Sequence, residues 1–237
     1  MRLLTIVAAV AALSSATPVQ SPELVALEAS FAEHMPTMKE KRQGSSSNDV
    51  VSGACRDVFF IFARGSTEPG NMGLTVGPVT CSGLKITLGL GSVGCQGVGP
   101  QYRASVGDNL LPAGTSSAAI NNAVSLFETA SRRCPDATLV FGGYSQGAAV
   151  MHGAVSRLSS AIKAKTVGGV LYGDTRNFEE GGAIDNYPRN DVLIICRLDD
   201  GVCGIGLVVT AGHLLYTTDG SVTRGVSFLA GKVRATR

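Results

Sequence analysis

The sequence predicts a three-layer α/β/α sandwich built on about five parallel strands. Short, almost continuous apolar runs at residues 56–63, 137–141, 167–172 and 192–196 are typical of strands that are buried on both faces of a sheet. Stretches with helical spacing separate these runs. Ser145 lies in Gly-Tyr-Ser-Gln-Gly, between an apolar run and a helix-compatible stretch, which is the pattern of a nucleophile elbow.

The first half of the predicted sheet contains two strands. Residues 56–63 end in a turn-rich loop at residues 64–70, and ligands bind at this end of the strands in open α/β sheets. We expect a helix within residues 72–90 and a short strand within residues 96–102. Thr115 or Ser116 then caps a helix that runs to Arg133 and that has one apolar face, formed by Ile120, Val124 and Phe127.

The second half continues the alternation after the elbow. Residues 148–162 are expected to be helical, and strands follow at residues 167–172 and 192–196. An apolar loop at residues 204–212 leads to His213, and a helix at residues 226–233 ends the fold.

Composition limits the class of protein. The chain has 237 residues, of which 44% are hydrophobic and only 16% charged, as expected for one folded domain with a substantial core. The net charge of +2 is too small to indicate a nucleic acid partner.

The N-terminus reads as a secretion signal. Arg2 precedes an apolar run at residues 3–13, and the small residues 14–16 suit cleavage, so residues 1–16 are predicted to be a signal peptide. The run is too short to span a bilayer, and no other stretch approaches the length that a span requires. We therefore expect a secreted, extracellular protein without a membrane span.

Residues 17–42 are predicted to be a propeptide that ends at the dibasic Lys41-Arg42. Leu24, Leu27, Phe31 and Met35 recur in it at helical spacing, so the alternative is an N-terminal helix that the mature protein keeps. Residues 43–49 are expected to form a polar, flexible linker, and residues 50–237 the catalytic domain.

The cysteines predict disulfides. An even number in a secreted chain suggests three bridges, and zinc is disfavoured because paired C-x-x-C spacing is absent from the sequence. Two of the cysteines come just before predicted parallel strands, so they meet at the N-terminal edge of the sheet, and the other four close two short loops. The pairs are Cys55 with Cys134, Cys81 with Cys95, and Cys196 with Cys203.

Ser145 is the predicted nucleophile, and the backbone N–H of Gln146 faces the developing oxyanion. The serine needs a base. His34 falls in the predicted propeptide, and His152 lies about two helical turns past the serine, where we expect a partly exposed helix residue. His213 remains, on the loop after the last strand.

The base needs an orienting acid between Ser145 and His213. The possible residues are Asp174, Asp185, Asp191, Asp199 and Asp200. Asp200 is favoured because it lies in the loop that Cys196 and Cys203 would close. Asp174, at the end of a strand, is the second choice.

Three stretches resemble fungal cutinases. Residues 134–147, CPDATLVFGGYSQG, resemble their nucleophile signature, and residues 55–71, CRDVFFIFARGSTEPGN, resemble their oxyanion strand and loop. Residues 196–203, with His213 ten residues further on, resemble their acid–base stretch. The resemblance extends from residue 55 to the C-terminus.

This resemblance implies a lidless serine esterase with an α/β-hydrolase-like fold. It implies Ser145 as nucleophile, Asp200 as acid and His213 as base, with oxyanion donors from Ser66 and Gln146. It also implies that Asn109 orients Ser66, and it supports the same three disulfides, of which the 81–95 bridge occurs in only some members.

The chain departs from the family pattern beside the acid. Asp199 replaces a glycine and Gly201 replaces an aliphatic residue. A second carboxylate next to Asp200 could change the charge around the acid.

We expect hydrolysis of the plant polyester cutin and of short-to-medium acyl esters through an acyl-enzyme, by a monomer that needs no metal or organic cofactor. A lipase or a carbohydrate acetyl esterase on the same fold is the alternative, and a non-catalytic surface or effector protein is a third hypothesis. Two apolar segments would flank the site, partly as an exposed rim and partly as core: Val106, Leu110 and Leu111, and Ile205, Leu207, Val208 and Val209.

Overall fold

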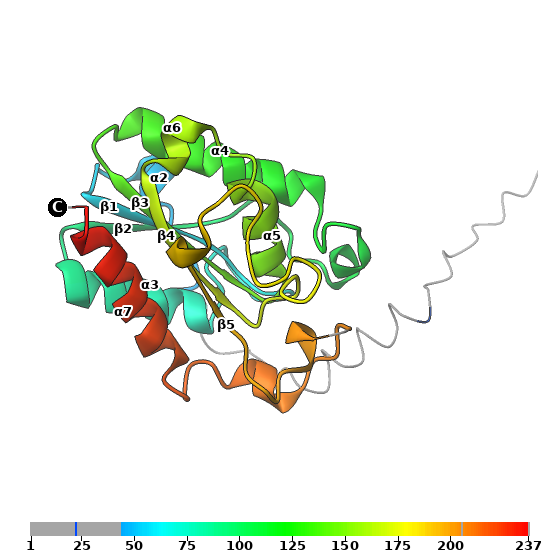
Figure 1. Cartoon of the computed structure of the whole chain (residues 1–237). Helices are drawn as coiled ribbons and strands as arrows, with labels where there is room; N and C mark the ends of the chain where they lie inside the picture. Colours follow the sequence, from blue (N-terminus) through cyan, green and yellow to red (C-terminus); the bar gives the residue numbers. More distant parts are fainter. Residues whose placement is uncertain (1–21, 23–43, 205, 237) are drawn as a thin grey trace, which may run out of the picture.

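Five parallel strands form one sheet in the computed structural model, which describes residue 22, residues 44–204 and residues 206–236. The strand order is β2-β1-β3-β4-β5, and each neighbouring pair is parallel (Figure 1). The strands are β1 (Val58–Ala63), β2 (Val93–Gly97), β3 (Thr138–Tyr144), β4 (Thr166–Tyr172) and β5 (Val192–Ile195). This confirms the predicted parallel sheet.

Helices cover both faces of the sheet and complete the predicted three-layer sandwich (Figure 1). On one face, α3 (Val76–Leu88) packs beside α7 (Ser221–Arg234). The opposite face carries α2 (Asp49–Ser52), α4 (Ser117–Arg133), α5 (Gln146–Val155) and α6 (Ser160–Lys163).

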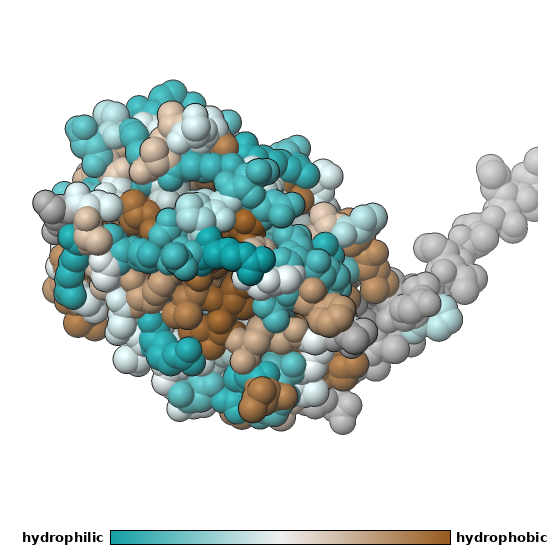
Figure 2. All heavy atoms as spheres, in the orientation of Figure 1, coloured by the Kyte–Doolittle hydropathy of each residue, from teal (hydrophilic) through white to brown (hydrophobic). Residues whose placement is uncertain are grey.

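Strand β1 shows why the central strands are almost continuously apolar. All six of its residues are buried. Phe59 and Ile61 belong to the core beneath α4 and α5, whereas Phe60 and Phe62 belong to the core beneath α3 and α7. At the edge, most of β5 is only half-buried, and Figure 2 shows apolar surface gathered in a hollow over this edge of the sheet.

The expected signal peptide (residues 1–16) and propeptide (residues 17–42) lie outside the described residues, apart from residue 22. The expected flexible linker is described from residue 44 on, and it packs against the domain. Ser45 is only 4% exposed, and its carbonyl oxygen accepts the backbone N–H groups of Asn71 and Met72. Ser47 N–H donates to the side chain of Asn71 at 2.9 Å. Residues 45–47 are therefore held in place by hydrogen bonds to the loop after β1, and this part of the expected linker is ordered against the domain.

Some boundaries differ from the predicted ones. Strand β2 occupies residues 93–97 instead of lying within residues 96–102, because the chain leaves the sheet before Pro100, which has no N–H to donate. The predicted helix 148–162 is two helices, since the Ser159 hydroxyl accepts from Ile162 N–H and starts α6 anew.

The three predicted disulfides are confirmed. Cys55 and Cys134, which are 79 residues apart, join the starts of β1 and β3 at the N-terminal edge of the sheet. Cys81 pairs with Cys95, and Cys196 pairs with Cys203. None of the described helices is long and apolar enough to cross a membrane.

Candidate active site

Ser145 occupies a strained turn between β3 and α5, with φ 56° and ψ −125°. Its N–H donates to the carbonyl oxygen of Tyr172 at 3.0 Å, which ties the turn to β4. A Cβ on Gly143 would lie 2.6 Å from the carbonyl oxygen of Gly147, and one on Gly147 would lie 2.0 Å from that of Ala63. Strand and helix can therefore close around the serine only because both positions are glycine.

His213 and Asp200 form a buried pair on the loops after β5. His213 lies in η4 (Ala211–Leu214), and its Nδ1 is 2.8 Å from Asp200 Oδ2. The two residues are 1% and 5% exposed. Burial opposes ionisation of Asp200, but its hydrogen bonds to His213, to the Tyr216 hydroxyl and to Val202 N–H outweigh it, so the pKa of Asp200 lies below its ordinary value.

Two buried polar atoms at this place lack a hydrogen-bond partner among the described residues: Ser145 Oγ and His213 Nε2. Tyr144, the residue before the serine, holds His213 in position. The two rings stack with their centroids 4.9 Å apart, and the Tyr144 hydroxyl donates to the His213 carbonyl oxygen. The serine and the imidazole are thus neighbours of the same residue, Tyr144, at the carboxyl end of β3. Their unpaired atoms are the two that a proton transfer would join.

Ser66 and Gln146 lie next to the serine: a Cβ on Gly65 would be 3.4 Å from Ser145 Cβ, and Gln146 directly follows the serine in the chain. Ser66 follows β1 and is 1% exposed, and Asn109 Nδ2 donates to its Oγ at 3.0 Å. Because Ser66 Oγ accepts this bond, its own proton is free to point elsewhere. Gln146 is the first residue of α5, and its side-chain Nε2 donates to the Ser105 carbonyl oxygen at 2.7 Å, which ties the loop carrying Asn109 to the elbow.

Glu68 anchors the loop that carries Ser66, a role that sequence reasoning missed. Its carboxylate, in a residue only 3% exposed, accepts hydrogen bonds from Gly65 N–H, Leu74 N–H and both the N–H and the hydroxyl of Thr75. Arg64 Nε donates to the Glu68 carbonyl oxygen at 2.6 Å. The side chain and the carbonyl oxygen of one buried glutamate therefore both hold the loop in place.

Asp174, the second choice for the acid, is engaged elsewhere. Its Oδ2 lies 2.8 Å from His152 Nε2, and His152 Nδ1 lies 2.9 Å from Glu180 Oε2. The expectation that His152 is a partly exposed helix residue is wrong, since it is 3% exposed. The segment between β4 and β5 folds over α5 and brings both carboxylates to it. Burial disfavours charged His152, but these hydrogen bonds and charges prevail and raise its pKa to about 9.

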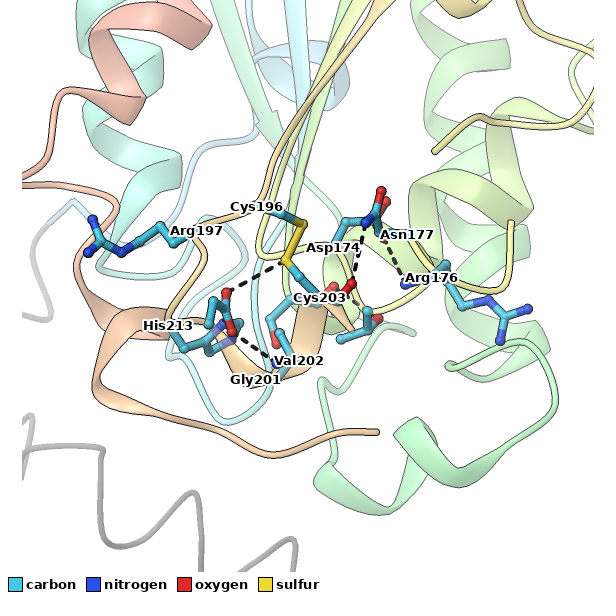
Figure 3. The surroundings of a disulfide bond; sticks show 12 residues. Asp174, Arg176, Asn177, Cys196, Arg197, Gly201, Val202, Cys203 and His213 are labelled. Atoms are coloured by element: carbon cyan, nitrogen blue, oxygen red, sulfur yellow. Dashed lines mark hydrogen bonds and ion pairs between the residues drawn. A yellow bond between two sulfur atoms is a disulfide. The ribbon is translucent and has the colours of Figure 1, made fainter. Parts of the chain in front are cut away.

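The disulfide between Cys196 and Cys203 separates the two carboxylate–histidine clusters (Figure 3). His213 lies on one side of it, and Asp174 and Asn177 lie on the other. Asn177 Nδ2 donates to the Cys203 carbonyl oxygen at 3.3 Å, so the loop that carries Asp200 is braced from outside.

Asp199 pairs with Arg197 and makes no hydrogen bond to Asp200 or His213 among the described contacts. Arg197 binds it at two points, with Nε 2.8 Å from Oδ1 and Nη2 3.0 Å from Oδ2. Arg197 Nη1 also binds Asp219 at 2.5 Å. The hydrogen bonds from Arg197 hold the pKa of Asp199 below its ordinary value. The positive charge of Arg197 therefore balances the carboxylate that stands where the family has a glycine.

The apolar segments divide into core and surface, as expected. Val106 and Val209 are buried and pack with Val202, which joins the two segments. The surface part consists of Leu110, Leu111 and Val208, which are 44%, 43% and 59% exposed. Ile205 lies outside the described residues.

Tyr216 is another contact that sequence reasoning missed. Its hydroxyl donates to Asp200 Oδ2 at 2.5 Å. The only signal in the sequence was its position three residues after His213. Among the residues that the structure describes, three or more His, Cys, Asp or Glu side chains nowhere gather into a group that could hold a metal ion.

A strained serine at the end of β3, beside a histidine that a buried carboxylate orients, is the arrangement of serine hydrolases with an α/β-hydrolase-like fold. The cutinase family profile matches residues 54–233. The chain therefore belongs to the cutinase family, whose members are carboxylic ester hydrolases.

Relatives agree with this assignment. A probable cutinase 3 of Neosartorya fischeri is 49% identical over 82% of this chain and 89% of its own length. A cutinase of Fusarium solani subsp. cucurbitae is 43% identical over 100% of this chain and 99% of its own.

Solved structures agree as well. A Trichoderma reesei cutinase in complex with a phosphonate inhibitor is 33% identical, covers 80% of each chain and has a TM-score of 0.70. The catalytic core of an acetyl xylan esterase from the same fungus has a TM-score of 0.60 at 18% identity, over 76% of this chain and 100% of its own, which shows likeness of fold alone.

Proposed function

We propose that the protein is a secreted serine esterase that hydrolyses cutin and short-to-medium acyl esters through an acyl-enzyme. The observation that carries this proposal is the placement of two unpartnered atoms, Ser145 Oγ and His213 Nε2: Tyr144, the residue before the serine, stacks on the His213 ring, and a buried carboxylate binds the other ring nitrogen. Family membership and the relatives named above support the same reaction.

In the first half of the reaction, Ser145 Oγ attacks the ester carbonyl carbon while His213 Nε2 accepts the hydroxyl proton. Asp200 stabilises the resulting imidazolium through Nδ1. The carbonyl oxygen becomes an oxyanion, which the N–H of Gln146 at the start of α5 and the N–H and hydroxyl of Ser66 stabilise. The oxyanion then collapses, and the leaving alcohol takes the proton from His213.

In the second half, a water molecule takes the place of the alcohol. His213 accepts a proton from this water as its oxygen attacks the acyl carbon, and the collapse releases the acid and returns the proton to Ser145. All of these side chains belong to one chain, so we infer that a monomer is sufficient for the reaction.

The exposed part of the apolar segments supports a waxy polymer as substrate. Leu110, Leu111 and Val208 expose apolar surface beside the site, which suits long hydroxy-acyl chains. Val202, whose N–H binds Asp200, packs with Val106 and Val209 and so joins both segments to the loop that carries this carboxylate.

We infer that residues 1–16 direct secretion and that cleavage after Arg42 removes residues 17–42, which leaves the linker at residues 43–49 and the catalytic domain at residues 50–237. The three disulfides support an oxidising compartment. Intact-mass measurement of the secreted protein, with and without reduction, tests the start of the mature chain. A start at residue 17 would show that the amphipathic segment is retained.

The central experiment compares wild type with Ser145→Ala on cutin, a triglyceride and acetylated xylan. We expect wild type to release monomers from cutin and the variant to be inactive with an unchanged circular dichroism spectrum. A phosphonate should label Ser145 and no other serine. Activity on acetylated xylan alone or on triglyceride alone would show that this ester, and not cutin, is the substrate. An active Ser145→Ala variant would refute the covalent mechanism.

A further inference from the structure

Tyr216 contacts the acid–base pair without taking part in the proposed proton transfer. Its hydroxyl donates to Asp200 Oδ2 at 2.5 Å, and the same oxygen accepts from His213 Nδ1 at 2.8 Å. The Tyr216 oxygen in turn accepts the backbone N–H of Arg197 at 3.2 Å. Because this oxygen already has a donor, its single proton is directed to the carboxylate.

The surroundings keep this proton in place. Tyr216 is 1% exposed, and its ring meets those of Tyr144, Tyr172 and His213 edge to face, with centroids 6.2, 6.2 and 6.3 Å away. Burial raises the pKa of the Tyr216 phenol above its ordinary value, and the hydrogen bond to Asp200 raises it further. The phenol therefore remains a hydrogen-bond donor at neutral pH and below.

We propose that Tyr216 is a positioning residue of the esterase reaction proposed above: its hydroxyl holds Asp200 Oδ2 against His213 and takes up part of the carboxylate charge. A carboxylate oxygen that accepts a strong hydrogen bond from a phenol attracts the neighbouring imidazolium less. Tyr216 thus sets both the orientation of the base and the pH at which the base loses activity by protonation.

Other groups around the pair remain the same when the phenol is removed. Val202 N–H binds Asp200 Oδ1 at 3.0 Å, and Cys203 Sγ, 3.8 Å from Oδ2, is in a disulfide and has no proton to donate. The charged or titratable groups nearby are Tyr144 on β3, Tyr172 on β4, Glu68 in the loop that carries Ser66, and the surface cluster of Arg197, Asp199 and Asp219.

The first test is Tyr216→Phe, assayed on a soluble butyrate ester over a range of pH. We expect kcat to fall about tenfold with KM within about twofold, because orientation is lost and ester binding is not. The acid limb of kcat/KM should move to higher pH by about 0.5 unit, since the less compensated carboxylate favours protonated His213. An acid limb that does not move would refute the proposal.

Tyr172→Phe is the matched control. It removes the hydroxyl group from another ring of the same cluster. The Tyr172 hydroxyl forms a hydrogen bond with Thr80 Oγ1 at 3.1 Å and none with Asp200. We expect its pH profile to match that of wild type. If both variants move the limb alike, the effect comes from the ring cluster and the proposal fails.

A double-mutant cycle with Asp200→Asn separates action through the acid from a general structural role. If Tyr216 acts through Asp200, Tyr216→Phe should change the rate little in the Asp200→Asn background. The same fold-change in both backgrounds would overturn the proposal.

Site-specific replacement of Tyr216 by 3-fluorotyrosine covers the case in which the phenylalanine variant does not fold. This residue keeps the shape and donates a stronger hydrogen bond, so the acid limb should move to lower pH, and an unmoved limb would contradict the proposal. The parent esterase function is tested separately by Ser145→Ala. If that variant is inactive while the Tyr216 variants leave the profile unchanged, only the positioning role fails.

Discussion

Arg197 binds Asp199 at two points, with N···O distances of 2.8 and 3.0 Å, and thereby holds this carboxylate in an ion pair separate from the bond between its neighbour Asp200 and His213. The two adjacent aspartates have opposite environments. Asp200 is 5% exposed and binds His213, whereas Asp199 lies at the surface in an ion pair. Arg197 therefore balances the negative charge of Asp199, the residue that departs from the family pattern, so this charge has little effect on Asp200 and His213.

Asp199→Gly should consequently leave kcat within about threefold, and the acid limb of the pH–rate profile should move by less than about 0.2 unit. If the charge of Asp199 were not balanced, it would favour protonated His213 and raise the pH at which activity is lost in acid. Removing the carboxylate would then lower that pH. The comparison is a pH–rate profile of wild type and variant at low and high salt. A clear downward shift would show that Arg197 does not compensate Asp199.

Asp200→Asn should lower kcat by about 10⁴, because the amide no longer stabilises the imidazolium or selects its tautomer. Asp174→Asn is the control, since Asp174 binds His152 instead. Steady-state kinetics on a soluble ester at neutral pH measures both. Loss of activity in Asp174→Asn, with Asp200→Asn active, would show that the acid is Asp174.

Ser66→Ala should lower kcat by roughly 10²–10³ with little change in KM, since one oxyanion donor is lost while the ester still binds. Asn109→Ala should give a smaller loss, because it frees the Ser66 hydroxyl to rotate without removing it. Thermal melting checks that both variants fold. An unchanged kcat in Ser66→Ala would place the oxyanion away from this hydroxyl.

His152 should make stability depend on pH above neutrality. Its pKa is raised to about 9 in the folded protein, against about 6.5 when unfolded, so its contribution is complete below pH 6.5 and is lost as pH rises through 9. The full contribution is on the order of 3 kcal/mol. Urea unfolding at pH 6, 7.5 and 9 should therefore show the gap between wild type and His152→Gln narrowing as pH rises. A constant gap would mean that His152 is neutral in the fold.

Local pattern was sufficient for much of this molecule. The buried strands are recognisable because a parallel strand must be apolar on both faces, as Phe59 and Phe60 show in β1. Ser145 is recognisable because only glycine fits at positions 143 and 147. His213 was predicted from the small number of histidines, and the structure places it against Asp200. The pairing of Cys55 with Cys134 followed from the edge of the sheet on which both lie.

Long-range folding decided the rest. His152 is buried because a segment more than twenty residues further along the chain places Asp174 and Glu180 over α5. Asp199 and Asp200 are the same residue type side by side, and only the positions of Arg197, Asp219 and Tyr216 around the loop give them different environments. Residues 44–48 look like a flexible polar linker until the partners around Asn71 are in place. A polar side chain or backbone group takes the partner that the tertiary structure brings within about 3 Å, and neighbours in the sequence do not specify that partner.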